Sequence, residues 1–107
     1  MIMINDQQIN SIDFAKALAD ETRQEIMSIC CCTKVSVNEI AEKLAVSQPT
    51  VSHHLKVLKD ANLVSAERQG KQVFYSVNQV QMAQACCKLS QDFAPDLPIS
   101  LENSETI

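Results

Sequence analysis

The sequence predicts a mainly helical fold with one β-hairpin, a winged helix-turn-helix in the order α-α-α-α-β-β-α. Two short amphipathic segments, 37–44 and 47–60, are separated by a tight turn. In a third segment, 63–77, apolar and polar residues alternate as in a half-buried hairpin, and a glycine lies near its centre. At 107 residues the chain fits one domain, long enough to bury roughly two-thirds of its unfolded surface but short enough to gain from a partner subunit.

The first two helices are predicted from their capping residues. Asn10 or Ser11 can cap the first helix, whose apolar side chains cluster on one side. Asp20 can cap a second helix from about Glu21 to about Cys31, because its carboxylate accepts free amide protons of the first turn. The predicted domain therefore begins after a flexible N-terminus formed by residues 1–10.

The next two helices form the predicted helix-turn-helix. A helix from about Val37 to Leu44 is followed by a turn at Ala45-Val46. Ser47 then starts a helix that runs to about Asp60, because its hydroxyl can accept amide protons of the first turn. Pro49 is tolerated near this start, where no amide proton is needed for the helix.

The fourth helix is predicted to have a packing face and a reading face. Val51, Leu55 and Leu58 fall together on a helical wheel, with His54 at their edge. A helix reads base edges when its N-terminal half lies in the major groove, so short polar donors and cations are expected on the opposite face. The predicted DNA-binding residues are Ser47, Gln48, Pro49, Thr50, Ser52, His53 and Lys56 on this helix, with Arg68 and Lys71 in the hairpin.

The alternating segment is predicted to turn at Gly70, the only glycine in the chain. Glycine adopts a positive φ at little steric cost, so its position indicates a tight turn. After the hairpin, Asn78 can cap a final helix from about Gln79 to Phe93. Prolines end the helical pattern beyond it, so 11–94 is the predicted domain and 95–107 a predicted acidic tail.

Charge is unevenly distributed along the chain. The formal net charge of −4 argues against a nucleic-acid partner, because phosphates are neutralised by Lys and Arg. However, residues 43–71 hold five Lys and Arg against two Asp and Glu, whereas 1–42 hold three against seven and 72–107 hold one against four. The basic segment is the predicted DNA-reading one, which favours double-stranded DNA as the partner.

Residues 11–93 resemble the ArsR/SmtB family of metal- and thiol-responsive bacterial repressors, most clearly in the runs ALADETRQEIMSI, VNEIAEKLAVSQPTVSHHLKVLKDANLV and ERQGKQVFYSV. The resemblance implies a homodimer joined through the first and last helices and a recognition helix from Ser47 to Lys59. It also implies that operator DNA is released when an inducer binds. Two-fold symmetry then requires an inverted-repeat operator with half-sites roughly 34 Å apart, or a multiple of that spacing.

The cysteines are the candidate sensing residues. The chain has no run of about 18 apolar residues, and its first residues lack the basic flank and apolar core of a signal peptide, so a cytoplasmic protein without membrane contact is expected. Thiols stay reduced in the cytoplasm, which favours metal or thiol sensing over a disulfide framework. The candidates are Cys30, Cys31, Cys32, Cys86 and Cys87.

One inducer site known in the family is absent from the sequence, and the ligands of a second are not matched at its first positions. Where arsenic- or cadmium-sensing members have a Cys-Val-Cys pair at the start of the third helix, this chain has Ser36-Val37-Asn38. The zinc-type site on the last helix uses Asp and His, but here Gln79 and Gln81 lie near the first ligand positions. The remaining thiols suit As(III), Sb(III) or a soft metal ion, and equally a persulfide modification; no obligatory cofactor is predicted.

The cysteines are expected to act through contacts between the second and last helices. Adjacent helical residues diverge by about 100°, so Cys86 and Cys87 share one ion only with help from elsewhere. Cysteines on the second and last helices can meet if these helices pack together. The opposing interpretation is plain packing, because free cysteine is often buried and Cys86 lies in an apolar stripe with Met82, Leu89 and Phe93.

Two other functions stay open from the sequence: a persulfide- or redox-sensing repressor of the same fold, and a winged-helix protein-association module without DNA binding. An enzyme is not predicted, because no Cys-x-x-Cys motif follows a strand and no nucleophile, base and orienting residue can be assigned. His54 is predicted to be a hydrogen-bonded core residue and His53 a DNA-facing donor, rather than metal ligands.

Overall fold

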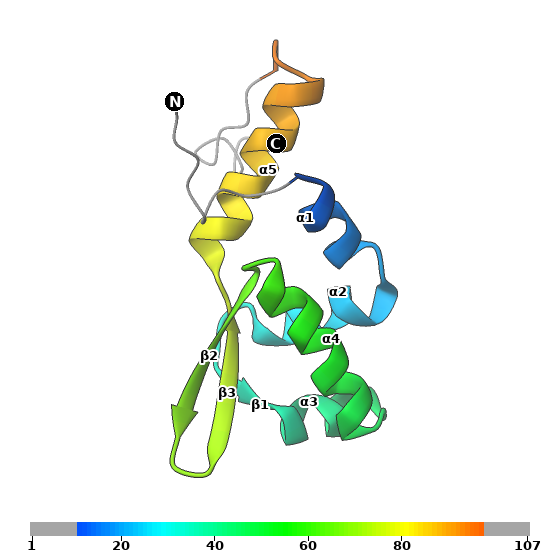
Figure 1. Cartoon of the computed structure of the whole chain (residues 1–107), viewed down its shortest axis with the longest axis vertical. Helices are drawn as coiled ribbons and strands as arrows, with labels where there is room; N and C mark the ends of the chain where they lie inside the picture. The colour runs from blue at the N-terminus through cyan, green and yellow to red at the C-terminus, as the bar shows by residue number, and fades with distance from the viewer. Residues whose placement is uncertain (1–10, 98–107) are drawn as a thin grey trace.

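The structure is a computed structural model that describes residues 11–97 (Figure 1). The predicted order of elements is confirmed, with one short strand added. Expectations for residues 1–10, and for the 98–107 part of the acidic tail, lie outside the described residues. The elements are α1 (Ser11–Leu18), α2 (Glu21–Cys30), β1 (Val35–Ser36), α3 (Val37–Leu44), α4 (Gln48–Asp60), β2 (Val64–Gln69), β3 (Gln72–Val77) and α5 (Gln79–Phe93).

The start of α2 forms as its sequence predicts. Asp20 has an extended backbone, and its carboxylate accepts the Arg23 amide hydrogen at 3.0 Å. This hydrogen bond is the main reason why the pKa of Asp20 lies below its usual value. α1 begins at Ser11, so the other cap candidate, Asn10, lies outside the described residues. α2 ends at Cys30, one residue before the predicted end, with Cys31 as its C-terminal cap.

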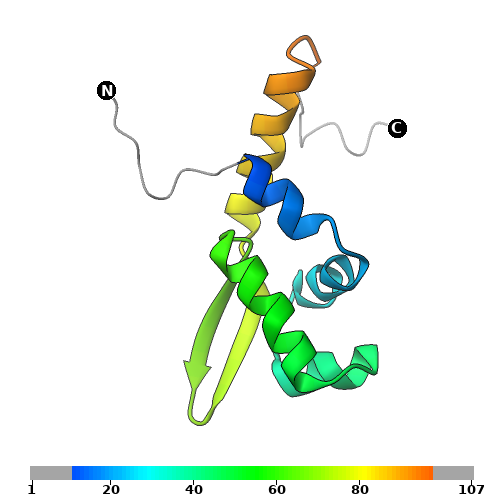
Figure 2. The same cartoon turned by 45° about the vertical axis from the view of Figure 1, so that its right-hand side comes forward.

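The hydrophobic core lies where α2, α3 and α4 pack against one another beside the sheet. Figure 2 shows these three helices gathered on one side of the hairpin, with α1 next to α5 above them. Burial of each large aliphatic side chain contributes roughly 1.5–3 kcal/mol, so the core fixes how α4 is presented. Its largest fully buried side chains are Ile26, Ile40, Leu55, Leu58, Leu63, Val51 and Cys30.

A capping box starts α3, and a left-handed residue ends it. The Ser36 hydroxyl accepts the Glu39 amide hydrogen at 3.2 Å, while the Glu39 carboxylate accepts the Ser36 amide hydrogen at 2.8 Å. At the other end Ala45 has φ 58°, and the amides of Ala45 and Val46 both donate to the Ala41 carbonyl. The predicted turn at Ala45-Val46 is thereby confirmed, without a glycine.

The wing is a three-stranded antiparallel sheet in the order β1-β3-β2. Gly70 has φ +65°, which confirms the predicted tip, and a Cβ added there would meet no atom within 4 Å. Glycine is therefore needed for the backbone angle and not for space. The sequence did not predict β1, whose Val35 pairs with Tyr75, because two residues are too short to show alternation.

The last helix, α5, extends past the rest of the molecule (Figures 1 and 2). Met82, Cys86 and Leu89 pack against the core, as the packing interpretation predicted. Phe93 does not: it is 81% exposed, because the outer turns of α5 rise beyond α1. No helix among residues 11–97 has both the length and the apolar character needed to cross a membrane.

Candidate nucleic-acid interface and cysteine groups

The start of α4 is held by Ser47. Its hydroxyl accepts the Thr50 amide hydrogen at 3.3 Å and lies 2.9 Å from the Thr50 hydroxyl oxygen. No acidic residue lies in the first turn of α4, whereas α1, α2 and α3 each carry one. No carboxylate of the first turn therefore neutralises the partial positive charge of this helix N-terminus. An anion such as a phosphate can interact with that charge.

The two faces of α4 are separated as predicted. Val51, Leu55 and Leu58 are at most 1% exposed, which anchors the helix along its whole length. Apart from the half-buried His54, the other side chains of its N-terminal half are turned to solvent and present hydroxyl, amide, imidazole and ammonium groups. The exposed residues are Ser47, Gln48, Pro49, Thr50, Ser52, His53 and Lys56.

Lys56 is partly neutralised in the free chain. Its ammonium lies 3.1 Å from a carboxylate oxygen of Asp60, one helical turn further on. Both side chains are well exposed, so the pair adds little stability. The ammonium remains available to a stronger anion.

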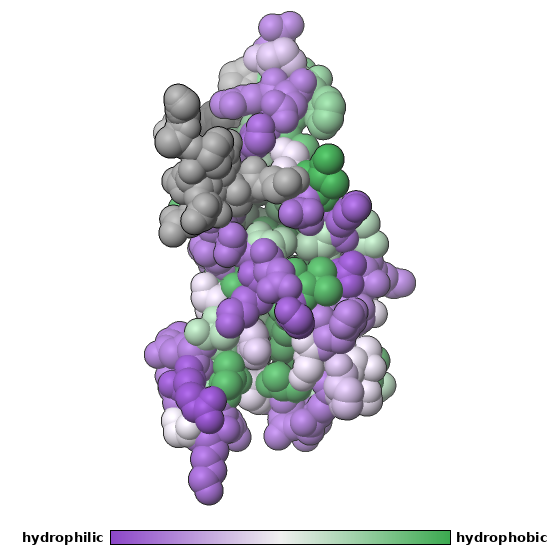
Figure 3. Space-filling model, viewed as in Figure 1, coloured by the Kyte–Doolittle hydropathy of each residue, from purple (hydrophilic) through white to green (hydrophobic). Residues whose placement is uncertain are grey.

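The tip of the wing is hydrophilic, as the lower end of the molecule in Figure 3 shows. Arg68 and Lys71 flank this tip and are exposed. Further up, Lys34 forms an ion pair with Glu67 of β2, and this hydrogen bond is the main reason why the pKa of Glu67 is lowered. The loop after α2 is thereby tied to the strand that carries Arg68.

A cleft of about 320 Å³ lies between α3, α4 and β3. Gln48 and Ser52 line it from α4, so two predicted DNA-binding residues share it. Asn38 and Gln72 line it too, and the sequence analysis did not select them. The sequence could have indicated Gln72, because it directly follows Lys71 at the wing tip. Asn38 joins this surface only because α3 packs on α4. The lining residues are Ser36, Val37, Asn38, Gln48, Ser52, Gln72, Val73 and Tyr75.

His54 links α4 to the N-terminal helices. Its Nδ1 lies 3.1 Å from Arg23 Nη1, and because arginine can only donate, the imidazole accepts. Arg23 also donates to the carbonyl oxygens of Ala17 at 2.6 Å and of Lys16 at 3.2 Å. The prediction of a hydrogen-bonded histidine at the packing edge is confirmed for His54.

The three cysteines at the end of α2 differ in their surroundings. Cys30 is fully buried, and burial raises the pKa of its thiol to about 11. Cys31 and Cys32 lie beyond the helix, are exposed, and bring their Sγ atoms to 3.3 Å from each other. The hydrogen bond between them is the main reason why the pKa of Cys31 is raised.

The cysteines of α5 lie further along that helix than its contact with the end of α2. Gln79 Nε2 donates to the Cys31 carbonyl oxygen at 2.8 Å, so the start of α5 lies against the end of α2. Cys86 is two turns further along, roughly 10 Å at 1.5 Å per residue. It is half-buried, whereas Cys87 is exposed. Within residues 11–97, no three His, Cys, Asp or Glu side chains gather where they could hold a metal ion.

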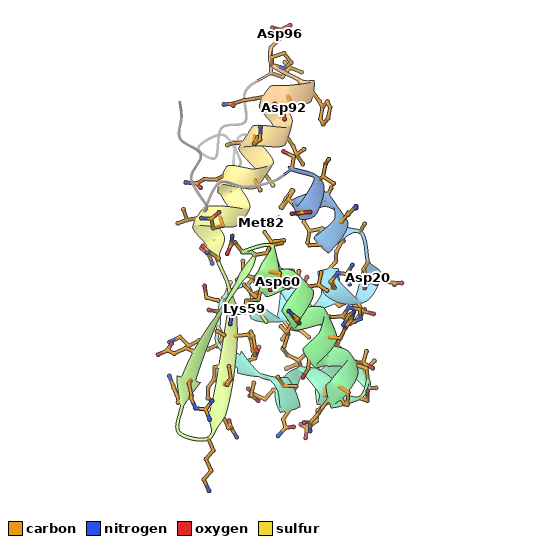
Figure 4. All side chains as sticks on the ribbon, viewed as in Figure 1. Asp20, Lys59, Asp60, Met82, Asp92 and Asp96 are labelled. Atoms are coloured by element: carbon orange, nitrogen blue, oxygen red, sulfur yellow. The ribbon has the colours of Figure 1, made fainter. Side chains whose placement is uncertain are left out.

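Acidic side chains lie at the end of the molecule remote from the wing. Figure 4 shows Asp92 and Asp96 at the outer end of α5. Asp92 lies 3.6 Å from the Lys88 ammonium, in the same i, i+4 arrangement as the ion pair on α4. Positive charge at the wing tip and negative charge at the opposite end give the chain a charge polarity that its net charge hides.

Comparison with known proteins gives the family. Residues 20–66 match the model for the arsR family of bacterial regulatory proteins. The arsenical resistance operon repressor of Bacillus subtilis is 38% identical over 78 residues, which cover 67% of this chain and 74% of the repressor. This chain belongs to the ArsR family. The resemblance found in the sequence is thereby confirmed.

Two other matches are also transcriptional regulators or DNA-binding domains. The transcriptional repressor SdpR of B. subtilis is 38% identical over 63 residues, covering 59% of this chain and 70% of SdpR. The homodimeric winged helix-turn-helix DNA-binding domain of Mb0332 from Mycobacterium bovis matches in structure with a TM-score of 0.64 and 28% identity, covering 81% of this chain and 80% of that domain. These relatives are named as regulators rather than enzymes, in agreement with the expectation of no catalytic activity.

In this ArsR-family chain, residues at the positions of two familiar inducer sites form hydrogen bonds within the fold. Ser36, at the position of a soft ligand in arsenic- or cadmium-sensing members, caps α3 and is 7% exposed. Gln79, near the first ligand position of the zinc-type site, is hydrogen-bonded to Cys31.

Proposed function

We propose that this ArsR-family protein is a dimeric, sequence-specific DNA-binding repressor, and that a thiophilic inducer lowers its operator affinity by binding its cysteines. One observation supports the proposal most strongly: the first two turns of α4 expose polar donors while Val51, Leu55 and Leu58 on the opposite side are fully buried. A helix so anchored presents its donors in fixed positions, as reading of base edges in the major groove requires.

On this proposal the N-terminal half of α4 enters the major groove. The Gln48 amide can make two hydrogen bonds with an adenine edge, and the hydroxyls of Thr50 and Ser52 suit bases or phosphates. Arg68 and Lys71 at the wing reach phosphates or the minor groove, outside the contacts made by α4. The carboxylate-free start of α4 adds a favourable site for a backbone phosphate.

A second copy of the chain is the proposed partner of α1 and α5. Four large apolar side chains on or next to these helices are exposed in the single chain, at 64–81%: Ile12, Val80, Phe93 and Leu97. Hydrophobic surface is also visible in Figure 3 on the upper part of the molecule, where α1 and α5 lie. Burial of these side chains in a two-fold dimer would place two copies of α4 on an inverted-repeat operator.

The inducer is proposed to be As(III), Sb(III) or another soft metal ion. Exposed thiols provide soft ligands for such species. The name of the B. subtilis relative, an arsenical resistance operon repressor, supports this chemical class. A persulfide modification of the same thiols is the alternative, and exposure to polysulfide followed by thiol counting separates the two.

Selection of bound duplexes from a random-sequence library, followed by fluorescence anisotropy with the selected duplex, tests the DNA-binding proposal. We expect an inverted repeat, and a slope of log affinity against log salt of about −0.9 for each phosphate contact. Lys71→Ala should make that slope less steep by about 1 for each subunit. Lys16→Ala removes the same charge from α1 and should leave it unchanged. No shifted duplex at low salt, or binding that is insensitive to salt, contradicts the proposal and favours a protein-association module.

A further inference from the structure

We propose that Cys31 and Cys32 form the inducer-capture site, a vicinal dithiol that binds a trivalent arsenical and transmits its presence to α5 and the wing. This inference rests on the proposed function and assigns the inducer role to one pair among five thiols. It rests on the close approach of the two exposed sulfurs, which lie just beyond the last residue of α2.

The geometry distinguishes this pair from the other cysteines. Its Sγ atoms lie 3.3 Å apart and both residues are exposed. Because a metal–thiolate bond is about 2.3 Å long, one soft atom can bond two sulfurs at this separation. Cys86 and Cys87 instead lie on a regular helix, one half-buried and one exposed. Cys30 is fully buried in the core and cannot be reached without unfolding.

The number of thiols selects the chemical class. Zinc and similar divalent ions take about four protein ligands in a closed site, but no cluster of three or more candidate ligands occurs in the described part of the chain. A monosubstituted trivalent arsenical needs only two bonds to sulfur. Each As–S bond forms as one As–OH bond breaks, and the hydroxyl leaves as water with the thiol proton. Arsenic stays trivalent, so no oxidant or reductant is required.

The loop that carries the pair is attached to two parts of the DNA-binding unit. On one side, the Cys31 carbonyl accepts the hydrogen bond from Gln79, the first residue of α5. On the other side, Lys34 forms its ion pair with Glu67, the neighbour of Arg68 in β2. Closure of a ring through both sulfurs restricts the backbone of Cys31 and Cys32. The orientation of the Cys31 carbonyl then changes, and the Gln79 hydrogen bond weakens.

The coupling follows from the place of α5. This helix begins directly after β3 of the wing and carries part of the proposed dimer surface. A change at Gln79 therefore shifts the wing relative to the dimer helices, and with it the spacing of the two recognition helices. Typical coupling between two sites lowers affinity roughly 5- to 150-fold, which is sufficient for release of operator DNA.

Phenylarsine oxide, which as its hydrate has two exchangeable hydroxyls, is the probe for the full-length chain. We expect one equivalent to bind, with two of the five thiols lost from a free-thiol count. DNA affinity should fall roughly 5- to 150-fold. The Cys31→Ser/Cys32→Ser variant should bind DNA normally and lose both the capture and the response. The matched Cys86→Ser/Cys87→Ser variant should retain both, and Gln79→Ala should capture the arsenical with a smaller change in DNA affinity.

Four results overturn the inference: a Cys31→Ser/Cys32→Ser variant that still responds, loss of the response in the Cys86→Ser/Cys87→Ser variant, capture without any change in DNA affinity, and an unmodified chain that captures nothing. Failure of the proposed function is distinguishable, because a chain that binds no duplex at low salt can still be examined for capture by mass spectrometry and thiol counting. Arsenite in place of phenylarsine oxide should give the same pattern among the variants.

Discussion

In α4, exposed polar residues lie opposite a fully buried apolar face, whereas in each cysteine group residues of one type are divided between core and surface. The reading face of α4 repeats with the helical period, so its exposure follows from local sequence. The cysteines at 30–32 begin inside a helix and continue past its end. Only the first of them, Cys30, belongs to the core.

The difference teaches that residue type alone does not assign a role to a thiol. Cys30 serves as a small hydrophobic side chain, while Cys31 and Cys32, next in sequence, are open to reagents. On α4, neighbours such as Leu55 and Lys56 are also divided between core and surface. There, however, the helical period of apolar residues predicts which of them is buried. Substitutions of buried residues in α4 and in the cysteine groups should therefore change the free energy of unfolding, whereas substitutions of exposed residues should change binding.

The largest effect is expected from the buried side of α4. Leu55→Ala removes a side chain that is 1% exposed and leaves a cavity, so the free energy of unfolding should fall by about 2–5 kcal/mol. Urea denaturation measures this loss. Ser52→Ala, on the exposed side of the same helix, should change the stability by less than about 0.5 kcal/mol. Equal losses from the two variants would refute the division of α4 into two faces.

The exposed side should show the converse. Gln48→Ala should weaken operator binding by about 1–3 kcal/mol and relax the base preference at one position of each half-site, without changing the melting temperature. Anisotropy on the selected operator and on its single-base variants measures this. Gln91→Ala, which removes an exposed amide from the far part of α5, is the control and should bind as the unaltered chain does. A Gln48→Ala protein with full specificity would show that α4 reads its site without this residue.

A smaller effect should identify Cys30 as a core residue. Cys30→Ala should lower the free energy of unfolding by about 1 kcal/mol near neutral pH, mainly through lost apolar burial. The Cys30 pKa is raised from 9.0 to about 11 in the folded chain, so the folded state holds the thiol proton more tightly. The raised pKa of Cys30 therefore contributes to the free energy of unfolding below pH 9. This contribution is lost as the pH rises to about 11, because the thiol of the unfolded chain ionises first.

The gap in stability between the unaltered chain and Cys30→Ala should therefore narrow between pH 9 and 11. Thermal melts of both proteins at a series of pH values measure the gap, and groups common to both proteins cancel in the difference. A gap that stays constant over this range would mean that the Cys30 thiol is not shielded from water.

The smallest effect concerns the ion pair between Lys56 and Asp60. Asp60→Asn should change the stability by less than about 1 kcal/mol, because the pair is exposed. It should nevertheless strengthen DNA binding at low salt, since the Lys56 ammonium loses its competing carboxylate, and the gain should fade as salt screens it. Asp92→Asn breaks the similar pair with Lys88 at the outer end of α5 and should leave DNA affinity unchanged. Equal gains from both variants would indicate a general effect of net charge.

Much of the fold was predictable because its signals are local. Asp20, Ser47 and Asn78 are capping residues whose hydrogen bonds involve only the next few amides, and all three cap the helices predicted for them. Gly70 marks the wing tip by its backbone freedom alone. The apolar face of α4 follows from periodicity.

The remaining features depend on contacts between distant segments. The pairing of Val35 with Tyr75 joins residues 40 positions apart, and two residues of β1 contain no pattern of their own. Asn38 reaches the cleft beside Gln48 only because α3 packs on α4. The proximity of the Cys31 and Cys32 sulfurs depends on where α2 ends, and the exposure of Phe93 depends on how far α5 extends past α1.

The separation of charge along the molecule bears on how fast it finds its site. The longest dimension of the molecule is 45 Å, whereas electrostatic forces in solution at 0.1 M salt decay over about 10 Å. Carboxylates at the outer end of α5 are thus too remote to oppose a docked wing. Only the basic tip therefore interacts with the phosphates of a duplex as the molecule approaches it. An acidic protein can in this way search a polyanion efficiently.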